Sequence, residues 1–234
     1  MSWTLSVMKN RIRNLCTLQE PSQLSEANLL AYLNRFYTWQ LPKEIKPIQL
    51  NTWYDVTLAD GDESYDLKKD FYDTYVRLDP LAYISSTEGR KDYQMSVYYN
   101  LEDFYAIWPD GLDYTDSSNT AKPSSVLIYN NQLLFRKCPD DTYYFSMKAI
   151  RRPLVYVNET AITTTANEFV NDNDTPEVEE WGQFIVYGTV KNILEEMGSL
   201  EDLQAIMNLY MNEKSNIHSQ TLGWSNGLRA KPRF

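Results

Sequence analysis

Two acidic segments carry the side chains best suited to holding a hard cation. Residues 60–66 contain four acids, and residues 171–174 contain two acids and two amides. The oxygen atoms of such groups are the ligands that Ca²⁺ prefers. Neither segment has the D-x-[DN]-x-[DN]-G spacing of a calcium-binding loop. A solvated turn and the entry to a helix explain both segments, and the sequence predicts no metal site.

Residues for nucleophilic or cofactor-dependent catalysis are sparse. His218 is the single histidine, and Cys16 and Cys138 lie far apart, so the cysteines are expected to be reduced and packed as small hydrophobes. There is no G-x-S-x-G, P-loop or dinucleotide motif, and Thr163-Thr164-Thr165 has no base beside it. The expectation is a protein that is not an enzyme and that uses no cofactor. A hydrolase with a carboxylate pair stays open, because 32 acids allow some pair in any fold.

The C-terminal segment combines aromatic and basic residues without any acid. The pattern from residue 223 onward has no helical or strand periodicity, and it predicts an extended arm over 223–234 that becomes ordered on a partner. Its large side chains would anchor the arm and its cations would form salt links. The predicted interface residues of the arm are Trp224, Leu228, Arg229, Lys231, Arg233 and Phe234.

The composition places the chain among globular proteins. Of its 234 residues 43% are apolar, which suffices for one core or for a core with a smaller satellite. The N-terminus lacks the basic start and apolar run of a signal peptide, so we expect synthesis in a cytoplasm. The net charge of -10 argues against tight binding of nucleic-acid phosphates. The 18 tyrosines and 6 tryptophans suit either strands or partly wet interfaces.

Helices are predicted near both ends of the chain, with a β-rich domain between them. Residues 1–47 should form N-terminal helices, the firmest at about 25–38, where Ser25 can cap the first turn. Pro42 and Pro47 are expected to end this region.

The β-rich domain is predicted over 48–170. Its clearest signal is a hairpin at 125–137, where Asn130-Asn131 links two apolar runs.

A helical hairpin is predicted over 176–215, packing against residues 1–47. Thr175 would cap its first helix and Pro176 would be the first helical residue. Gly182 and Gly188 suggest close approach of another backbone. The residues expected in the inter-helix packing are Trp181, Phe184, Ile185 and Gly188. The fold class is therefore α+β, a helical bundle with an antiparallel sheet or sandwich inserted.

The order of these elements is similar to that of one family of virion proteins. The helix of residues 24–37, the Pro-x-x-x-x-Trp segment at 176–181 and the terminal Pro232-Arg233-Phe234 resemble the head-to-tail adaptor proteins of short-tailed bacteriophages, also called connector or gatekeeper proteins. The resemblance covers most of the chain and is least clear over residues 60–125.

The resemblance implies a structural protein of the virion. Such a protein forms a homo-oligomeric ring, commonly of twelve copies, between the portal protein and the tail or nozzle proteins. DNA passes through the lumen of the ring without sequence-specific contact, and an acidic wall would let it slide. In such proteins the C-terminal arm reaches along the portal, and no membrane is involved. The alternative function from another class is a carbohydrate- or peptide-binding β module with a surface rich in Tyr and Trp.

Overall fold

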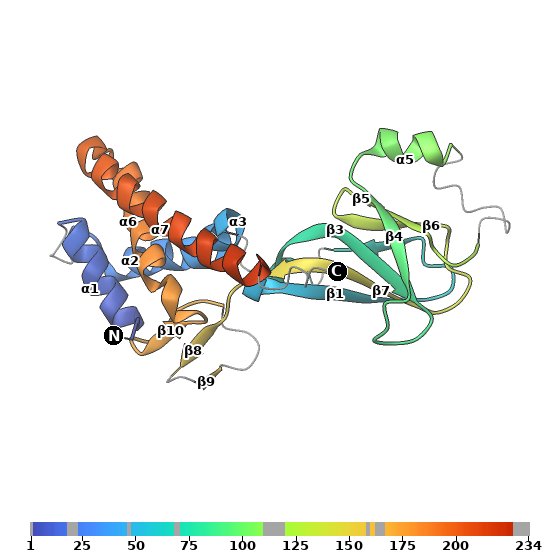
Figure 1. Cartoon of the computed structure of the whole chain (residues 1–234), viewed down its shortest axis with the longest axis horizontal. Coiled ribbons are helices and arrows are strands. Elements are labelled where there is room, and N and C mark those ends of the chain that lie inside the picture. Colours follow the sequence, from blue (N-terminus) through green and yellow to red (C-terminus); the bar gives the residue numbers. More distant parts are fainter. Residues whose placement is uncertain are drawn as a thin grey trace, which may run out of the picture. The chain divides into compact units, whose positions relative to one another are not determined.

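The computed structural model describes residues 2–17, 23–45, 48–67, 71–109, 120–157, 160–161 and 167–226. The protein is α+β, with helices near both ends of the chain and a large sheet in its middle (Figure 1). It divides into two compact units. Residues 1–50 and 152–234 form the first, which we call the helical unit, and residues 51–151 form the second, which we call the sheet unit.

The helical unit begins with two capped helices. Helix α1 spans Leu5–Leu15, where the Thr4 side chain accepts a hydrogen bond from the Val7 amide. Helix α2 spans Glu26–Arg35, and the Ser25 hydroxyl accepts one from the Asn28 amide at 3.2 Å. Each cap satisfies an amide that the first turn leaves without a helical partner. The cap predicted at Ser25 is confirmed.

Pro42 does not end the second helical region, as the sequence had suggested. The chain continues through a π-helical turn, η1 (Phe36–Gln40), into the short helix α3 (Leu41–Ile45) and then a 3-10 turn, η2 (Ile48–Leu50). The Leu41 amide donates to the Phe36 carbonyl, five residues back. A proline ring clashes with the carbonyl four residues before it in a regular α-helix, and the wider turn lies where that clash would occur.

The predicted helix entry at Thr175 and Pro176 is wrong, because these residues lie in a strand. Strand β10 (Asp174–Pro176) pairs with β8 (Val155–Val157), which also pairs with β9 (Thr160–Ala161). The buried Asp174 carboxylate accepts hydrogen bonds from the Val170 and Asn171 amides, both at 2.7 Å. These hydrogen bonds to Asp174 stabilise the turn that leads into β10.

The helical hairpin starts later and ends later than the sequence suggested. A 3-10 turn, η4 (Glu179–Trp181), leads into α6 (Gly182–Met197), which ends at Gly198 with a φ of 72°. Helix α7 then runs over Leu200–Asn226, well past residue 215. Gly223 and Trp224, which were assigned to the extended arm, therefore lie in its last turns.

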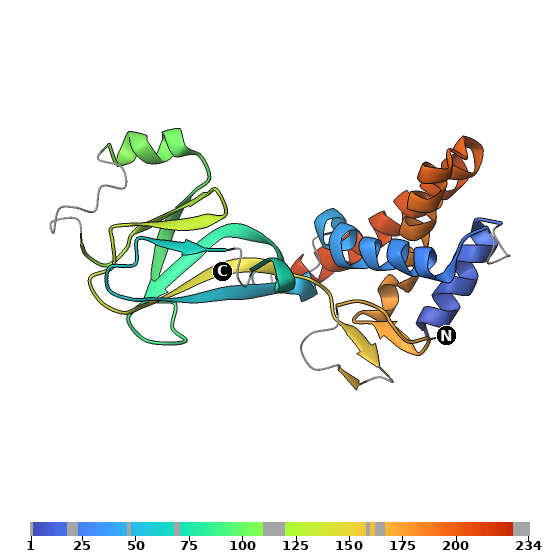
Figure 2. The ribbon, with the colours of Figure 1, turned by 180° about the vertical axis from the view of Figure 1, so that it is seen from behind.

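The described part of the sheet unit contains one sheet in the strand order β1-β7-β3-β4-β5-β6-β2 (Figure 2). Neighbouring strands are antiparallel except β4 and β5, which are parallel. Two short helices, α4 (Phe71–Thr74) and α5 (Leu101–Ile107), flank the strands in sequence. The strands are β1 (Asn51–Leu58), β2 (Ser64–Asp66), β3 (Tyr75–Ser85), β4 (Tyr93–Tyr98), β5 (Ser125–Tyr129), β6 (Gln132–Arg136) and β7 (Tyr143–Arg151).

Alternation along the strands places one face of this sheet in the core. On β1, Tyr54, Val56 and Leu58 are buried, whereas the residues between them face outward. Phe135 and Phe145 meet edge to face at a ring-centroid distance of 5.1 Å in the same core. Successive side chains of a strand point to opposite faces of the sheet, so the sheet buries one face. Its other face can carry polar side chains.

Two details of the strands bear on the sequence predictions. The β5–β6 hairpin turns through Asn130 and Asn131, with φ values of 50° and 61°, the left-handed backbone that a two-residue Asn-Asn link adopts. Strand β3 contains Pro80, and its register with β7 shifts between Leu78 and Ala82. A proline is tolerated in a strand at such an irregularity.

Candidate functional site

The centre of the helical unit is a stack of aromatic rings. The rings of Phe184 on α6 and Tyr210 on α7 are stacked at 5.0 Å with an interplanar angle of 15°. Phe36 meets both of them edge to face. Phe184, Ile185 and Trp181 are all buried, so these predicted packing residues lie inside the unit. They therefore hold the helices of one chain together and do not form a surface for a partner.

The two glycines of α6 make room for side chains and not for a second backbone. A Cβ atom on Gly188 would overlap the ring of Phe36, and one on Gly182 would overlap the ring of Trp3. The prediction that each glycine marks a close approach is confirmed. The prediction that the neighbouring group is a backbone is wrong. Sequence spacing shows that a small residue is needed, but it does not show which group fills the space.

A half-buried carboxylate links α3 to α7. The Glu44 carboxylate accepts hydrogen bonds from the Tyr210 hydroxyl and from Lys214 Nζ, the latter at 2.8 Å. Burial alone would raise the pKa of Glu44, but these hydrogen bonds and the charges of Lys214 and Lys191 hold it below its ordinary value. The same carboxylate adds to burial in raising the pKa of Tyr210. The hydrogen bonds of Glu44 link α3 to α7 and so help to hold α7 in place.

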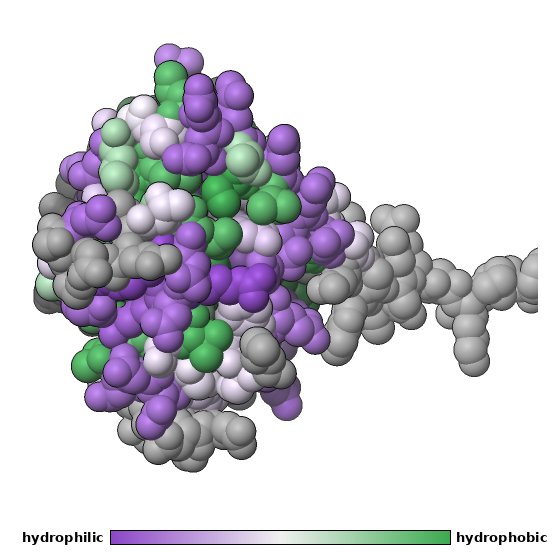
Figure 3. Space-filling view, turned by 90° about the vertical axis from the view of Figure 1, so that its left-hand side faces the viewer, coloured by the Kyte–Doolittle hydropathy of each residue, from purple (hydrophilic) through white to green (hydrophobic). Residues whose placement is uncertain are grey.

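Helix α7 leaves a row of large apolar side chains uncovered. Leu200, Met207 and Met211 are 71%, 36% and 55% exposed, and Met197 at the end of α6 is 55% exposed. The spacing of seven and four residues places the three α7 side chains on one face of the helix, which we call the α7 stripe. The buried side chains of Ile206, Tyr210 and Ile217 lie on another face. Figure 3 shows apolar side chains beside polar ones on the end of the helical unit that faces left in Figure 1.

Arg13 joins α1 to the start of α2. Its Nη2 donates to the Leu24 carbonyl at 2.9 Å and to Glu26 Oε1 at 2.7 Å. Lys9 lies 3.4 Å from Glu26 and 3.0 Å from Asp172. The hydrogen bond from Arg13 is the main cause that lowers the pKa of Glu26. Arg11 takes a different place, with its guanidinium 5.4 Å from the ring centroid of Trp3.

Most of the predicted arm lies outside the described residues. This applies to the side chain of Trp224 and to Leu228, Arg229, Lys231, Arg233 and Phe234. The two acidic segments are described, and among described residues no group of three or more His, Cys, Asp or Glu is arranged to hold a metal ion. Asp62 instead accepts a hydrogen bond from the Ala59 amide at 2.7 Å.

The two cysteines are free and buried, Cys16 in the helical unit and Cys138 in the sheet unit. Burial, with a smaller effect of the Asp202 charge, raises the pKa of Cys16 to about 11, and burial also raises the pKa of Cys138. Both thiols are therefore held in their protonated, weakly nucleophilic form. His218 is half-buried on α7.

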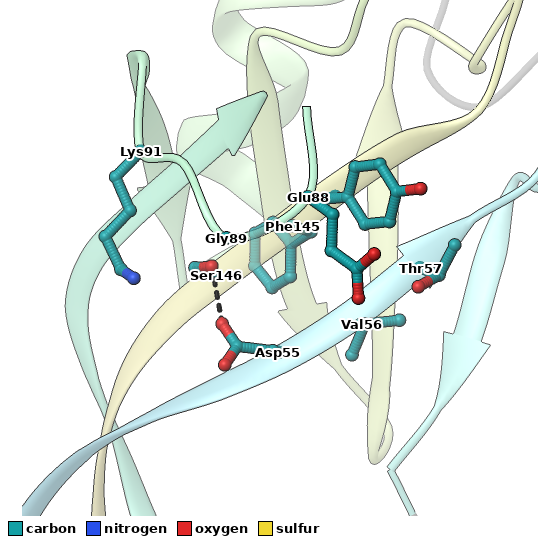
Figure 4. A pocket seen from close by; sticks show the side chains of 9 residues that line it. Asp55, Val56, Thr57, Glu88, Gly89, Lys91, Phe145 and Ser146 are labelled. Carbon is teal, nitrogen blue, oxygen red and sulfur yellow. Dashed lines mark hydrogen bonds between the residues drawn. The ribbon is translucent and has the colours of Figure 1, made fainter. Parts of the chain in front are cut away.

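The sheet unit carries a polar pocket of about 210 Å³ on the outward face of β1 and β7 (Figure 4). Asp55 on β1 accepts a hydrogen bond from the Ser146 hydroxyl on β7 at 2.5 Å. Glu88, Gly89 and Lys91, from the segment between β3 and β4, form the opposite wall. The remaining lining residues are Val56, Thr57, Tyr144 and Phe145. The sequence gives no sign of this pocket, because its residues come from three separate segments.

Comparisons with known proteins do not assign the chain to a family. Neither the protein-family models nor the curated proteins include a match to the chain. Among the described helices, none combines the length and the apolar composition that a membrane span requires.

Proposed function

We propose that the protein is a structural adaptor of a virion, which assembles as a homo-oligomeric ring between the portal and the tail. The observation that carries the proposal is the α7 stripe. Leu200, Met207 and Met211 are large, apolar and exposed on one helix face, next to the face that packs on α6. Large apolar side chains that gather on one exposed face of a folded protein favour association.

The architecture of the helical unit supports the same function. Helix α6 contacts α1, α2 and α7. Aromatic rings fill the core of the helical unit between them. In the proposed ring, these helices form a bundle with the α6–α7 hairpin as the packing unit between neighbours. The stripe would be buried against the next copy, in a head-to-tail contact that closes by rotation.

The remaining parts of the chain receive roles under the same proposal. The arm at the C-terminus would bind the portal protein, and the sheet unit would face the tail or nozzle proteins. DNA would pass through an acidic lumen without sequence-specific contact. In this role the protein carries out no catalysis, uses no cofactor, contacts no membrane and resides in the virion.

Mass photometry of the full chain, alone and mixed with the portal protein of the same virus, tests the proposal. We expect a ring-sized species on the portal. A variant carrying Leu200→Ser, Met207→Ser and Met211→Ser should lose that species. Leu209→Ser is the matched control, because Leu209 is 43% exposed on the same helix but about 200° around the axis from Met207. A monomer that never binds the portal, or equal loss in both variants, would overturn the proposal.

A further inference from the structure

The pocket of the sheet unit lies on the outward face of β1 and β7, and its walls are polar. Val56 and Phe145 are core residues, with 6% and 0% of their surface exposed, so their side chains point to the opposite face of the sheet. Asp55 and Ser146 are their neighbours in sequence and therefore project from the outward face. Ser146 is only 6% exposed, and its hydroxyl donates to the Asp55 carboxylate. The hydrogen bond fixes one oxygen of Asp55, and the second oxygen remains to accept from a ligand.

The opposite wall is held in place by its own hydrogen bonds. The Ser85 hydroxyl donates to Asp92 at 2.6 Å and accepts from the Thr87 amide at 2.9 Å. Gly89 has a φ of 74°, the left-handed backbone that glycine adopts without strain. These contacts brace the segment that carries Glu88 and Lys91. The pocket is therefore formed before any ligand binds, which lowers the entropic cost of binding.

An aromatic surface flanks the pocket. Trp53 lies two residues before Asp55 on β1 and so faces the same side of the sheet. Its ring is 5.8 Å from that of Tyr83, and Lys91 Nζ lies 4.5 Å from its centroid. Tyr144 lines the pocket itself. Carboxylates that accept hydrogen bonds from hydroxyl groups, beside aromatic rings that can cover C–H faces, suit a ligand with many hydroxyl groups such as a sugar.

We infer that this pocket binds a single neutral sugar residue, such as the end of a glycan chain. Asp55 and Glu88 would accept hydrogen bonds from sugar hydroxyls, and Lys91 would donate one. The two carboxylates disfavour an acidic sugar. The volume of about 210 Å³ is below the roughly 300–1,000 Å³ of pockets for larger ligands, so it suits one ring. This inference does not depend on the adaptor function.

Saturation-transfer NMR with the full chain and the methyl glycosides of glucose, galactose, mannose and N-acetylglucosamine tests the inference. We expect saturation transfer to at least one glycoside. The double variant Asp55→Ala with Glu88→Ala should lose most of it. The matched control is Glu102→Ala with Asp103→Ala, which removes two exposed acids of α5 outside the pocket and should leave the signal unchanged.

A second variant separates loss of binding from loss of folding. Thr57→Trp keeps both carboxylates and fills the pocket from an exposed strand position, so it should abolish the signal while the circular dichroism spectrum stays unchanged. No saturation transfer to any glycoside, or equal transfer in wild type and Thr57→Trp, would overturn the inference. A basic Gly-Arg-Gly peptide is the competing probe. Transfer to that peptide alone would show that the acids select cations and would also overturn it.

Discussion

The helical unit and the sheet unit place their polar groups in opposite ways. In the helical unit, the half-buried Glu44 carboxylate accepts hydrogen bonds from Tyr210 and Lys214 of α7. Large apolar side chains of the same helix remain outside. In the sheet unit, the core is apolar and the hydrogen-bonded pair Asp55–Ser146 lines an open pocket. The first arrangement suits association through an apolar surface, and the second suits recognition of a small polar ligand.

The largest expected effect comes from the aromatic stack. Phe184→Ala should lower the free energy of unfolding by about 3–5 kcal/mol, because it leaves a cavity between Phe36 and Tyr210. Chemical denaturation followed by circular dichroism measures this loss. Tyr129→Ala, at a side chain that is 51% exposed, should change it by less than about 0.5 kcal/mol. Similar losses in the two variants would contradict the closed core of the helical unit.

The second effect concerns the Glu44 carboxylate between α3 and α7. Glu44→Gln should lower the free energy of unfolding by about 1–3 kcal/mol at neutral pH, since it weakens hydrogen bonds to a charged group. Denaturation titrations measure it. Glu195→Gln is the control, because Glu195 itself is exposed and makes a contact of 3.4 Å with Lys191, four residues before it on the same helix, which should contribute about 0.5 kcal/mol or less. Equal effects would mean that Glu44 is no more important than a surface acid.

The Glu44 group also predicts a pH dependence. Its pKa in the folded protein is lowered, so its stabilising effect is complete above the unfolded value of 4.5. That effect is lost as the pH falls through the lower, folded pKa. Wild type should therefore lose more stability than Glu44→Gln when denaturation is repeated below pH 4.5. Parallel curves for the two proteins in acid would refute the assignment.

The smallest effect tests the hairpin of the sheet unit. Asn131 has a φ of 61°, so Asn131→Val should cost about 1–2 kcal/mol in strained backbone. Asn131→Gly is the matched variant and should be close to neutral, because glycine adopts this backbone freely. Thermal unfolding compares the three proteins. If valine is tolerated as well as glycine, the turn does not limit the stability of this unit.

The sequence by itself determined the local elements that depend on neighbours along the chain. The Ser25 cap, the left-handed Asn130-Asn131 link and the stop of α6 at Gly198 all act within a few residues. Alternation likewise separated the core face of β1 from its outward face. Such features follow from backbone geometry and side-chain chemistry, so they can be predicted without knowledge of the fold.

Only the tertiary structure decided which distant groups meet. Pairing with β8 drew Thr175 and Pro176 into a strand, although their sequence is typical of a helix start. The rings of Trp3 and Phe36, not a backbone, fill the spaces at Gly182 and Gly188. The pocket brings Asp55, Glu88 and Ser146 together from three segments. Contacts of this kind depend on how elements pack across long stretches of chain, and a one-dimensional pattern does not record that packing.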